Sequence, residues 1–319
     1  MTAPKVLVTG ASGFVGEAVV FRLLLGRRFM PVAAVRGSTR LQGLCPVVHF
    51  QLGAATAAQM TGVQVIVHAA ARVHVMHETA QDALAEFRRV NVDGTLQLAR
   101  LAARAGVKRF VYISSIKVNG ERTAPGRPFT AAAVAAPLDP YGVSKHEAEQ
   151  ALMSLGRETG MEIVIIRPPL VYGPGVKANF LSLLEWLDRG LILPLGGIRN
   201  QRSMVSIGNL VDLIETCLDH PGAAWQIFLV SDGDDLSTPR LLCRLASALG
   251  KKAWLLPVPS VLLTLGAAVI GKRAMAQRVC ESLQVDISKN RELLGWVPSI
   301  DVDTAMRRTA DHFMDTHTK

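Results

Sequence analysis

The chain has 319 residues, a formal net charge of +9 and 49% hydrophobic residues. This length allows one large domain or two, and the composition is that of a globular protein and excludes a disordered one. The positive charge suits an anionic ligand such as a nucleotide. The lysines and arginines are scattered with no long basic run, which argues against nucleic-acid binding.

The cysteines indicate the compartment. Cys45, Cys217, Cys243 and Cys280 are far apart in the sequence, so no zinc knuckle and no C-x-x-C redox motif is present. We expect four reduced thiols, no metal site and a cytoplasmic protein, since the N-terminus runs into a strand pattern without a signal peptide.

The first half of the chain alternates between apolar strands and amphipathic helices. This pattern predicts an α/β protein with a Rossmann fold, in which a doubly wound parallel sheet is covered by helices on both faces. The predicted strands are residues 5–10, 30–36, 63–71, 109–115 and 162–169, and the predicted helices are residues 16–28, 83–106 and 146–160.

After Pro169 the pattern becomes irregular. We expect a dinucleotide-binding domain over residues 1–170 and a smaller C-terminal α/β substrate lobe over 171–319, although strands near 164 and 228 could both join the main sheet. A ligand crevice is expected at the carboxyl ends of the strands, where the two lobes meet. The predicted helices of this half are residues 178–190, 208–219, 238–250 and 259–282.

Residues 254–271 carry no charge. Pro257 and Pro259 limit the apolar run to about a dozen residues, short of the roughly 20 that a spanning helix needs. We therefore expect no spanning segment but a buried or interfacial helix, with weak membrane association as a further reading.

A glycine pattern, Gly10, Gly13 and Gly16 in "VTGASGFVG", follows the first strand and opens the first helix. Gly10 permits a tight turn, Gly13 lets the backbone approach a pyrophosphate, and Gly16 lets helix and strand pack closely. The second strand ends at Arg36 with no acidic residue, which favours NADP over NAD while leaving both open.

Tyr141 and Lys145 in "PYGVSK" are four residues apart, so they share one helix face. A free phenol has a pKa of about 10, too high for a base at neutral pH. A neighbouring ammonium and a positively charged nicotinamide would lower that pKa.

With these motifs in this order, the chain resembles the extended short-chain dehydrogenase/reductase family, and within it the NAD-dependent nucleotide-sugar epimerase/dehydratase group. The further matching segments are "VHAAA" (67–71), "VNVDGT" (90–95), "YISSIKVNG" (112–120), "RPPLVYGPG" (167–175), "RSMVSIGNLVDLI" (202–214) and "LLGWVP" (293–298).

The resemblance implies catalysis by Ser115, Tyr141 and Lys145. Tyr141 would move the proton, Lys145 would also anchor the ribose hydroxyls, and Ser115 would hydrogen-bond the reacting oxygen. It implies binding of NAD or NADP by residues on the carboxyl ends of the strands, while His68 is expected to be structural. The cofactor-binding set is Gly10, Ser12, Gly13, Phe14, Val15, Gly16, Arg36, Ala69, Ala70, Ala71, Asn91, Ser114, Tyr141, Lys145, Pro168 and Leu170.

The resemblance also implies a nucleotide-sugar substrate, UDP-linked by preference, with its diphosphate held by Asn179 and Arg202 and its reacting oxygen by Ser115. Dehydratases of the family have an Asp-Glu pair where this chain has Ile116 and Lys117, so a dehydratase is disfavoured. A 4-epimerase and a 4-keto-sugar reductase for polysaccharide precursors both remain open.

Two family features are missing. Gly53-Ala54 replaces the Gly-Asp that contacts adenine, and no Arg-x-Gly-Asp segment occurs near the C-terminus. Two other classes of function stay open: a reductase of hydrophobic alcohols, ketones or steroids, and a non-catalytic module that senses NAD(P). The family also implies a homodimer through helices near 90–105 and 142–157.

Overall fold

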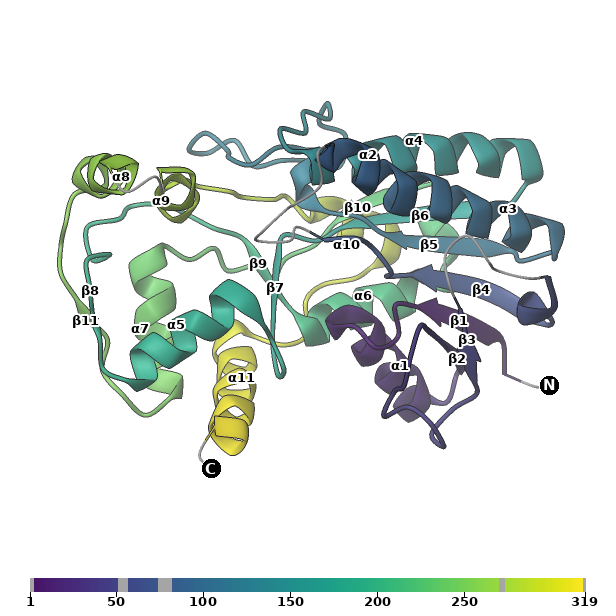
Figure 1. Ribbon diagram of the computed structural model, residues 1–319, viewed down its shortest axis with the longest axis horizontal. Helices are drawn as coiled ribbons and strands as arrows, with labels where there is room; N and C mark the ends of the chain where they lie inside the picture. The colour runs from purple at the N-terminus through teal and green to yellow at the C-terminus, as the bar shows by residue number, and fades with distance from the viewer. Residues whose placement is uncertain (1–2, 51–56, 74–81, 270–272, 318–319) are drawn as a thin grey trace.

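The computed structural model describes residues 3–50, 57–73, 82–269 and 273–317. Its centre is a seven-stranded sheet in the order β10-β6-β5-β4-β1-β2-β3, and every neighbouring pair of strands is parallel. This is the predicted doubly wound sheet (Figure 1). The strands are β1 (Lys5–Thr9), β2 (Met30–Val35), β3 (Val47–His49), β4 (Val63–His68), β5 (Arg109–Ile113), β6 (Glu162–Arg167) and β10 (Ile227–Leu229).

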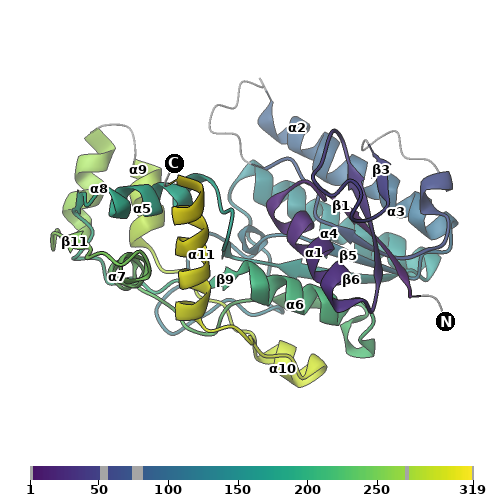
Figure 2. The ribbon, with the colours of Figure 1, turned by 90° about the horizontal axis from the view of Figure 1, so that it is seen from below.

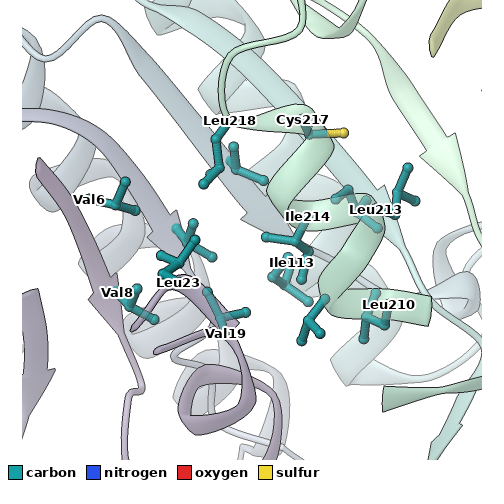
Figure 3. Packing of buried hydrophobic residues seen from close by; sticks show 14 of the residues in the cluster. Val6, Val8, Val19, Leu23, Ile113, Leu210, Leu213, Ile214, Cys217 and Leu218 are labelled. Carbon is teal, nitrogen blue, oxygen red and sulfur yellow. The ribbon is translucent and has the colours of Figure 1, made fainter. Parts of the chain in front are cut away.

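Helices cover both faces of the sheet, which explains why its strands are apolar on both sides. α1 (Phe14–Gly26) and α6 (Ile207–Cys217) pack together on one face. Their apolar side chains meet those of the strands, with Val19 and Leu23 of α1 and Leu210 and Ile214 of α6 in one cluster (Figure 3). On the opposite face, α3 (Thr95–Arg104) and α4 (Pro140–Thr159) bury a second cluster.

The helix predicted over 83–106 is three consecutive pieces. α2 (Ala83–Arg88) passes into a π-helical segment, η2 (Arg89–Gly94), which continues into α3. The helix predicted from 146 begins earlier, at Pro140, because Asp139 caps it and proline is favoured in the first turn. Tyr141 and Lys145 therefore lie within the first two turns of α4.

The second lobe begins where the chain leaves β6 and enters β7 (Leu170–Tyr172). The helices α5 (Ala178–Asp188), α7 (Thr238–Ala248) and α11 (Val302–His317) gather at one end of the molecule around their own apolar core (Figure 2). The chain crosses back to the sheet, since α6 packs on α1 and β10 pairs with β6, as a strand near 228 was expected to do. The elements of this half are β8 (Ile192–Leu193), β9 (Met204–Ser206), β11 (Trp254–Leu255), α5 (Ala178–Asp188), α7 (Thr238–Ala248), α8 (Ser260–Val269), α9 (Arg273–Cys280), α10 (Ser288–Leu294) and α11 (Val302–His317).

The segment that carries no charge, which begins at Trp254, forms β11 and α8, and α9 follows it. In the described ranges, no helix combines the length and apolar character needed to cross a membrane. Trp254, Val261, Leu262 and Leu265 are exposed, so the segment is not a buried helix, and its weak association with a membrane surface stays a prediction. The four cysteines are free thiols, as expected.

Candidate active site

The glycine loop closes the carboxyl end of β1. Gly10 has a φ of +68°, which favours glycine, and a Cβ there would lie 2.7 Å from the backbone nitrogen of Ala70. A Cβ on Gly16 would lie 2.2 Å from the carbonyl oxygen of Gly10, so α1 can approach β1 only with glycine at this position. The loop therefore has the close packing that a dinucleotide cradle needs.

The cradle continues onto the neighbouring strand. Ala69, Ala70 and Ala71 follow β4 and are half-buried beside Gly10. Ser12 and Gly13 are exposed at the start of α1, where backbone N–H groups have no partner within the helix. Between β1 and β4 the strand order reverses, which is where open α/β sheets bind ligands.

Asn91 ties three parts of this crevice together from within η2. It is 1% exposed, accepts a hydrogen bond from the backbone N–H of Arg72, and donates to the Arg72 carbonyl and to Ser144 Oγ. Ser144 in turn donates to the Tyr141 carbonyl. Asn91 thus fixes the first turn of α4 against the segment after β4, and its amide is occupied by protein groups.

The structure brings Ser115 and Tyr141 together. Ser115 follows β5, and its hydroxyl is near enough to the Tyr141 phenol to lower the pKa of that phenol. Lys145 lies one turn further along α4 and is 2% exposed; its Nζ donates to the Ile113 carbonyl at 2.8 Å. Nζ is 5.9 Å from the centroid of the Tyr141 ring and 4.4 Å from that of Tyr112.

In the protein alone the pKa of Tyr141 is raised above its ordinary value, first by burial and then by the carboxylate of Asp139, while Ser115 acts in the opposite direction. The expected lowering depends also on the charge of a bound nicotinamide and stays a prediction. Burial also lowers the pKa of Lys145 to about 7, against the opposing effect of Glu149.

A buried polar network lies behind Lys145, and the sequence analysis missed it. Glu149, one turn after Lys145, accepts two hydrogen bonds from Arg167 Nε, at 2.9 and 3.2 Å, and a hydrogen bond from Ser114 Oγ. Arg167 Nη1 also donates to Asn119 Oδ1 at 2.9 Å. Two features of the sequence could have indicated this network. Glu149 lies four residues after Lys145, on the same helix face, and Arg167 is the arginine that opens "RPPLVYGPG".

His68 has the structural role expected of it. It is buried between Thr9 and Thr95, with its ring nitrogens 2.6 and 3.0 Å from their hydroxyl oxygens. Burial lowers its pKa to about 3, with a smaller contribution from Lys145, so the imidazole is neutral.

The remaining candidates are spread around the crevice. Arg36 is exposed directly after β2, Pro168 is buried after β6, and Leu170 is 43% exposed. The half-buried Phe14 and Val15 open α1. Gly53-Ala54 lies outside the described residues.

The two substrate candidates belong to the second lobe. Asn179 is exposed in the first turn of α5. Arg202 forms backbone bridges to Leu236 and Leu283, and its Nη1 donates to the Glu281 carbonyl at 3.1 Å. Within the described ranges, no group of three or more His, Cys, Asp or Glu side chains could hold a metal ion.

A parallel sheet with this strand order, a glycine loop on its first strand and a Tyr-Lys pair beside it define a dinucleotide-dependent enzyme of the dehydrogenase/reductase type. The model of the NAD dependent epimerase/dehydratase family matches residues 6–230. The chain belongs to this family.

Relatives cover nearly the whole chain. A UDP-glucose 4-epimerase of Vibrio cholerae is 46% identical over 99% of this chain and 98% of its own length. The fold matches a UDP-glucuronic acid 4-epimerase from Bacillus cereus, solved with NAD, with a TM-score of 0.79, 20% identity and 98% of each chain covered. It also matches a UDP-glucose 4-epimerase from Thermotoga maritima, solved with UDP-glucose, with a TM-score of 0.77, 21% identity and 98% and 99% covered.

Proposed function

We propose that this protein is an NAD-dependent enzyme that inverts C4 of a UDP-sugar by removing and returning hydride at that carbon. The observation that carries the proposal is the placement of Ser115 beside Tyr141 at the carboxyl end of β5, with Lys145 one turn away and the glycine loop two strands across the sheet. Membership of the family and the 46% identity to a UDP-glucose 4-epimerase support it.

The residues of the site fit a dinucleotide, because the cradle at Gly10 and Gly16 has no room for a Cβ. Gly10, Ser12, Gly13, Phe14, Val15, Gly16, Ala69, Ala70, Ala71, Asn91, Ser114, Pro168 and Leu170 would line its site, with Tyr141 and Lys145 at the nicotinamide end. When bound, NAD supplies a hydride acceptor and a positive charge at the ring.

The protein's own groups manage the proton. The Tyr141 oxygen takes the proton of the C4 hydroxyl as the C4–H bond breaks, and it returns the proton when hydride comes back to the opposite face of the ketone. Ser115 hydrogen-bonds the C4 oxygen and keeps it beside the phenol. Lys145 holds the ribose hydroxyls and stabilises the phenolate.

A dehydratase needs an extra acid and base, and this chain offers Ile116 and Lys117 where that pair stands in the family. Ile116 is buried and has no proton to move. A 4-keto-sugar reductase uses the same three residues, and differs from an epimerase in releasing its oxidised cofactor after each turnover.

For the substrate, we propose that Asn179 and Arg202 hold the diphosphate, since a guanidinium can bind two phosphate oxygens at once. Residues 1–170, completed by α6 and β10, would form the cofactor-binding unit, and the rest of 171–319 the substrate lobe. For the cofactor, the exposed Arg36 keeps NADP as an alternative to NAD. Equilibrium dialysis of both dinucleotides decides between them.

We also propose a homodimer formed through α3 and α4, which lie side by side on the outer face of the sheet unit (Figure 1). Light scattering at micromolar concentration tests it, and a monomer would contradict it. We further propose a cytoplasmic location, which the four free thiols support.

The test is incubation of the purified protein with UDP-glucose, UDP-N-acetylglucosamine and UDP-glucuronic acid, with products separated by anion exchange. We expect a C4 epimer to appear with no net change in reduced nicotinamide. Stoichiometric consumption of the reduced cofactor with a 4-keto-sugar would identify the reductase. Oxidation of steroids, with every nucleotide sugar inert, would overturn the proposal, as would NAD binding without any turnover.

A further inference from the structure

A second lysine lies beside Tyr141, in the turn that carries Ser115. Lys117 belongs to the short helix η3 (Ile116–Val118), and its backbone N–H donates to Ser115 Oγ at 3.3 Å. Its Nζ is 5.9 Å from the centroid of the Tyr141 ring, the same distance as Lys145 Nζ. Two cations from different segments thus flank one phenol.

The partner of Lys117 is the carboxylate that begins α4. Asp139 Oδ1 accepts the N–H of Gly142 at 2.7 Å and caps the helix, while Oδ2 accepts a hydrogen bond from Lys117 Nζ. Lys117 Nζ is also 3.5 Å from Glu121 Oε1. The side chains of Lys117 and Asp139 are 27% and 19% exposed, so solvent screens this pair only in part.

The two segments are packed closely as well as paired. A Cβ on Gly142 would lie 2.9 Å from the Lys117 carbonyl oxygen, so the Ser115 turn rests directly on the first turn of α4. Ser115 and Tyr141, whose hydroxyls influence each other, lie on these same two turns. Any loosening of the contact would therefore separate the hydroxyl from the phenol.

The negative charge of Asp139 also disfavours the phenolate form of Tyr141. The cap places a negative charge two residues from Tyr141, and that charge opposes ionisation of the phenol. Among the described residues, Lys145 of α4, Tyr112 of β5, Lys117 of η3 and the uncharged ring of Phe87 of α2 also neighbour Tyr141. Two carboxylates neighbour the lysines instead: Glu149 raises the pKa of Lys145, and Glu121 Oε1 is 3.5 Å from Lys117 Nζ.

We propose that Lys117 is a positioning residue for the proposed C4 chemistry, which pairs with Asp139 to hold Ser115 against Tyr141 and to cancel the charge of the helix cap at the phenol. This rests on the proposed function. It accounts for a lysine where a dehydratase of the family has an acid, since an acid there would add a second negative charge beside Asp139.

Three variants distinguish an effect of the Lys117 and Asp139 charges on the phenol from a purely structural effect of their pairing. Lys117→Met removes the cation and leaves Asp139 uncompensated. Asp139→Asn removes the anion but retains a good helix cap. The double variant removes both charges. Glu121→Gln is the matched control, because Glu121 also neighbours Lys117 but does not cap α4.

The first readout is the pH profile of kcat for the sugar that the wild type turns over best. We expect the rising limb of Lys117→Met to move to higher pH by about one unit, with activity recovered at high pH, and that of Asp139→Asn to move to lower pH. The double variant should fall near wild type, as should Glu121→Gln, and Lys117→Arg should restore the profile. A purely structural role would instead lower kcat equally at every pH.

The second readout does not need turnover. The chain has only three tyrosines, so the tyrosinate absorbance that is lost in a Tyr141→Phe blank, measured with and without saturating NAD, reports Tyr141. We expect the titration midpoint of Tyr141 to be higher in Lys117→Met than in wild type, lower in Asp139→Asn, and near wild type in the double variant. Superimposed titrations of the single variants and wild type would overturn the inference. A wild type that binds NAD but turns over no sugar would overturn the proposed function alone.

Discussion

At the scale of single residues, Lys145 is a lysine that the fold removes from water. It is 2% exposed, and its Nζ donates a hydrogen bond to the carbonyl of Ile113. Burial lowers its pKa to about 7 from an ordinary value of 10.5. Its charge therefore changes within the physiological range, close to the phenol that it is proposed to assist.

This burial has a measurable effect on stability. Between pH 7 and 10.5 the unfolded chain binds a proton at Lys145 that the folded protein has lost, so the free energy of unfolding rises with pH across this window. The slope is at most about 1.4 kcal/mol for each pH unit. Below pH 7 both states are protonated and the contribution is a constant penalty.

We therefore expect the wild type to gain stability relative to Lys145→Met as the pH rises from 6.5 to 9.5. Urea denaturation at several pH values measures the difference, and Lys108→Met, an exposed lysine before β5, is the control that should show no such trend. A difference independent of pH would show that Lys145 keeps an ordinary pKa in the fold.

The sequence identified Ser115, Tyr141 and Lys145 because the first lies at a strand end and the others share a helix face. It could not identify Glu149, Arg167 or Lys117 as partners. Their contacts join segments 18 and 22 residues apart in the chain, and spacing predicts only neighbours within one element. The sequence also could not show that the protein environment raises the pKa of Tyr141, because that shift depends on burial.

At the scale of elements, α4 and β6 are joined by the ion pair between Glu149 and Arg167. Their side chains are 3% and 4% exposed, and the Ser114 hydroxyl supplies a further donor to the carboxylate. The pair holds the helix that carries Tyr141 and Lys145 against the strand that leads into the second lobe. A buried pair of this kind is costly to break on one side only, because the remaining charge has no partner.

Glu149→Gln should therefore destabilise the protein by about 3 kcal/mol or more, measured by urea denaturation at pH 7. Glu158→Gln, on the exposed end of the same helix, should change stability by less than about 0.5 kcal/mol. If Glu149→Gln unfolded at the same urea concentration as Glu158→Gln, the ion pair would have no structural importance.

Six of the seven strands of the main sheet were predicted because each is a continuous apolar run between helical segments, whereas the three-residue β3 was not predicted. The paired strands β7–β9 and β8–β11 were not predicted, since segments of two or three residues carry no period. The start of α4 was placed six residues late because the Asp139-Pro140 cap was overlooked. The π-helical η2 was also missed, since its sequence has an ordinary helical pattern.

At the scale of the whole molecule, the two lobes divide the proposed work. The sheet unit presents the glycine loop and Tyr141 at the carboxyl ends of its strands, and the chain then passes from β6 into the lobe that carries Asn179 and Arg202. α6 and β10 return to the sheet and tie the lobes together. This crossing explains why a single boundary at residue 170 is only approximate.

If the lobe holds the diphosphate, Arg202→Ala should raise the KM for the UDP-sugar about tenfold or more, with a smaller change in kcat and unchanged NAD binding. Arg199→Ala, an exposed arginine of the same segment, is the control and should leave KM unaltered. Equal KM values for Arg202→Ala and wild type would remove Arg202 from the substrate site.

The most direct measurement compares Tyr141→Phe with wild type in C4 epimerisation, with NAD binding measured on both proteins. The phenylalanine keeps the ring in its contact with Phe87 but has no proton to exchange. The account predicts a kcat lower by about 10²- to 10⁴-fold with NAD bound as tightly as in wild type. Turnover of the UDP-sugar by Tyr141→Phe at the wild-type rate would contradict it.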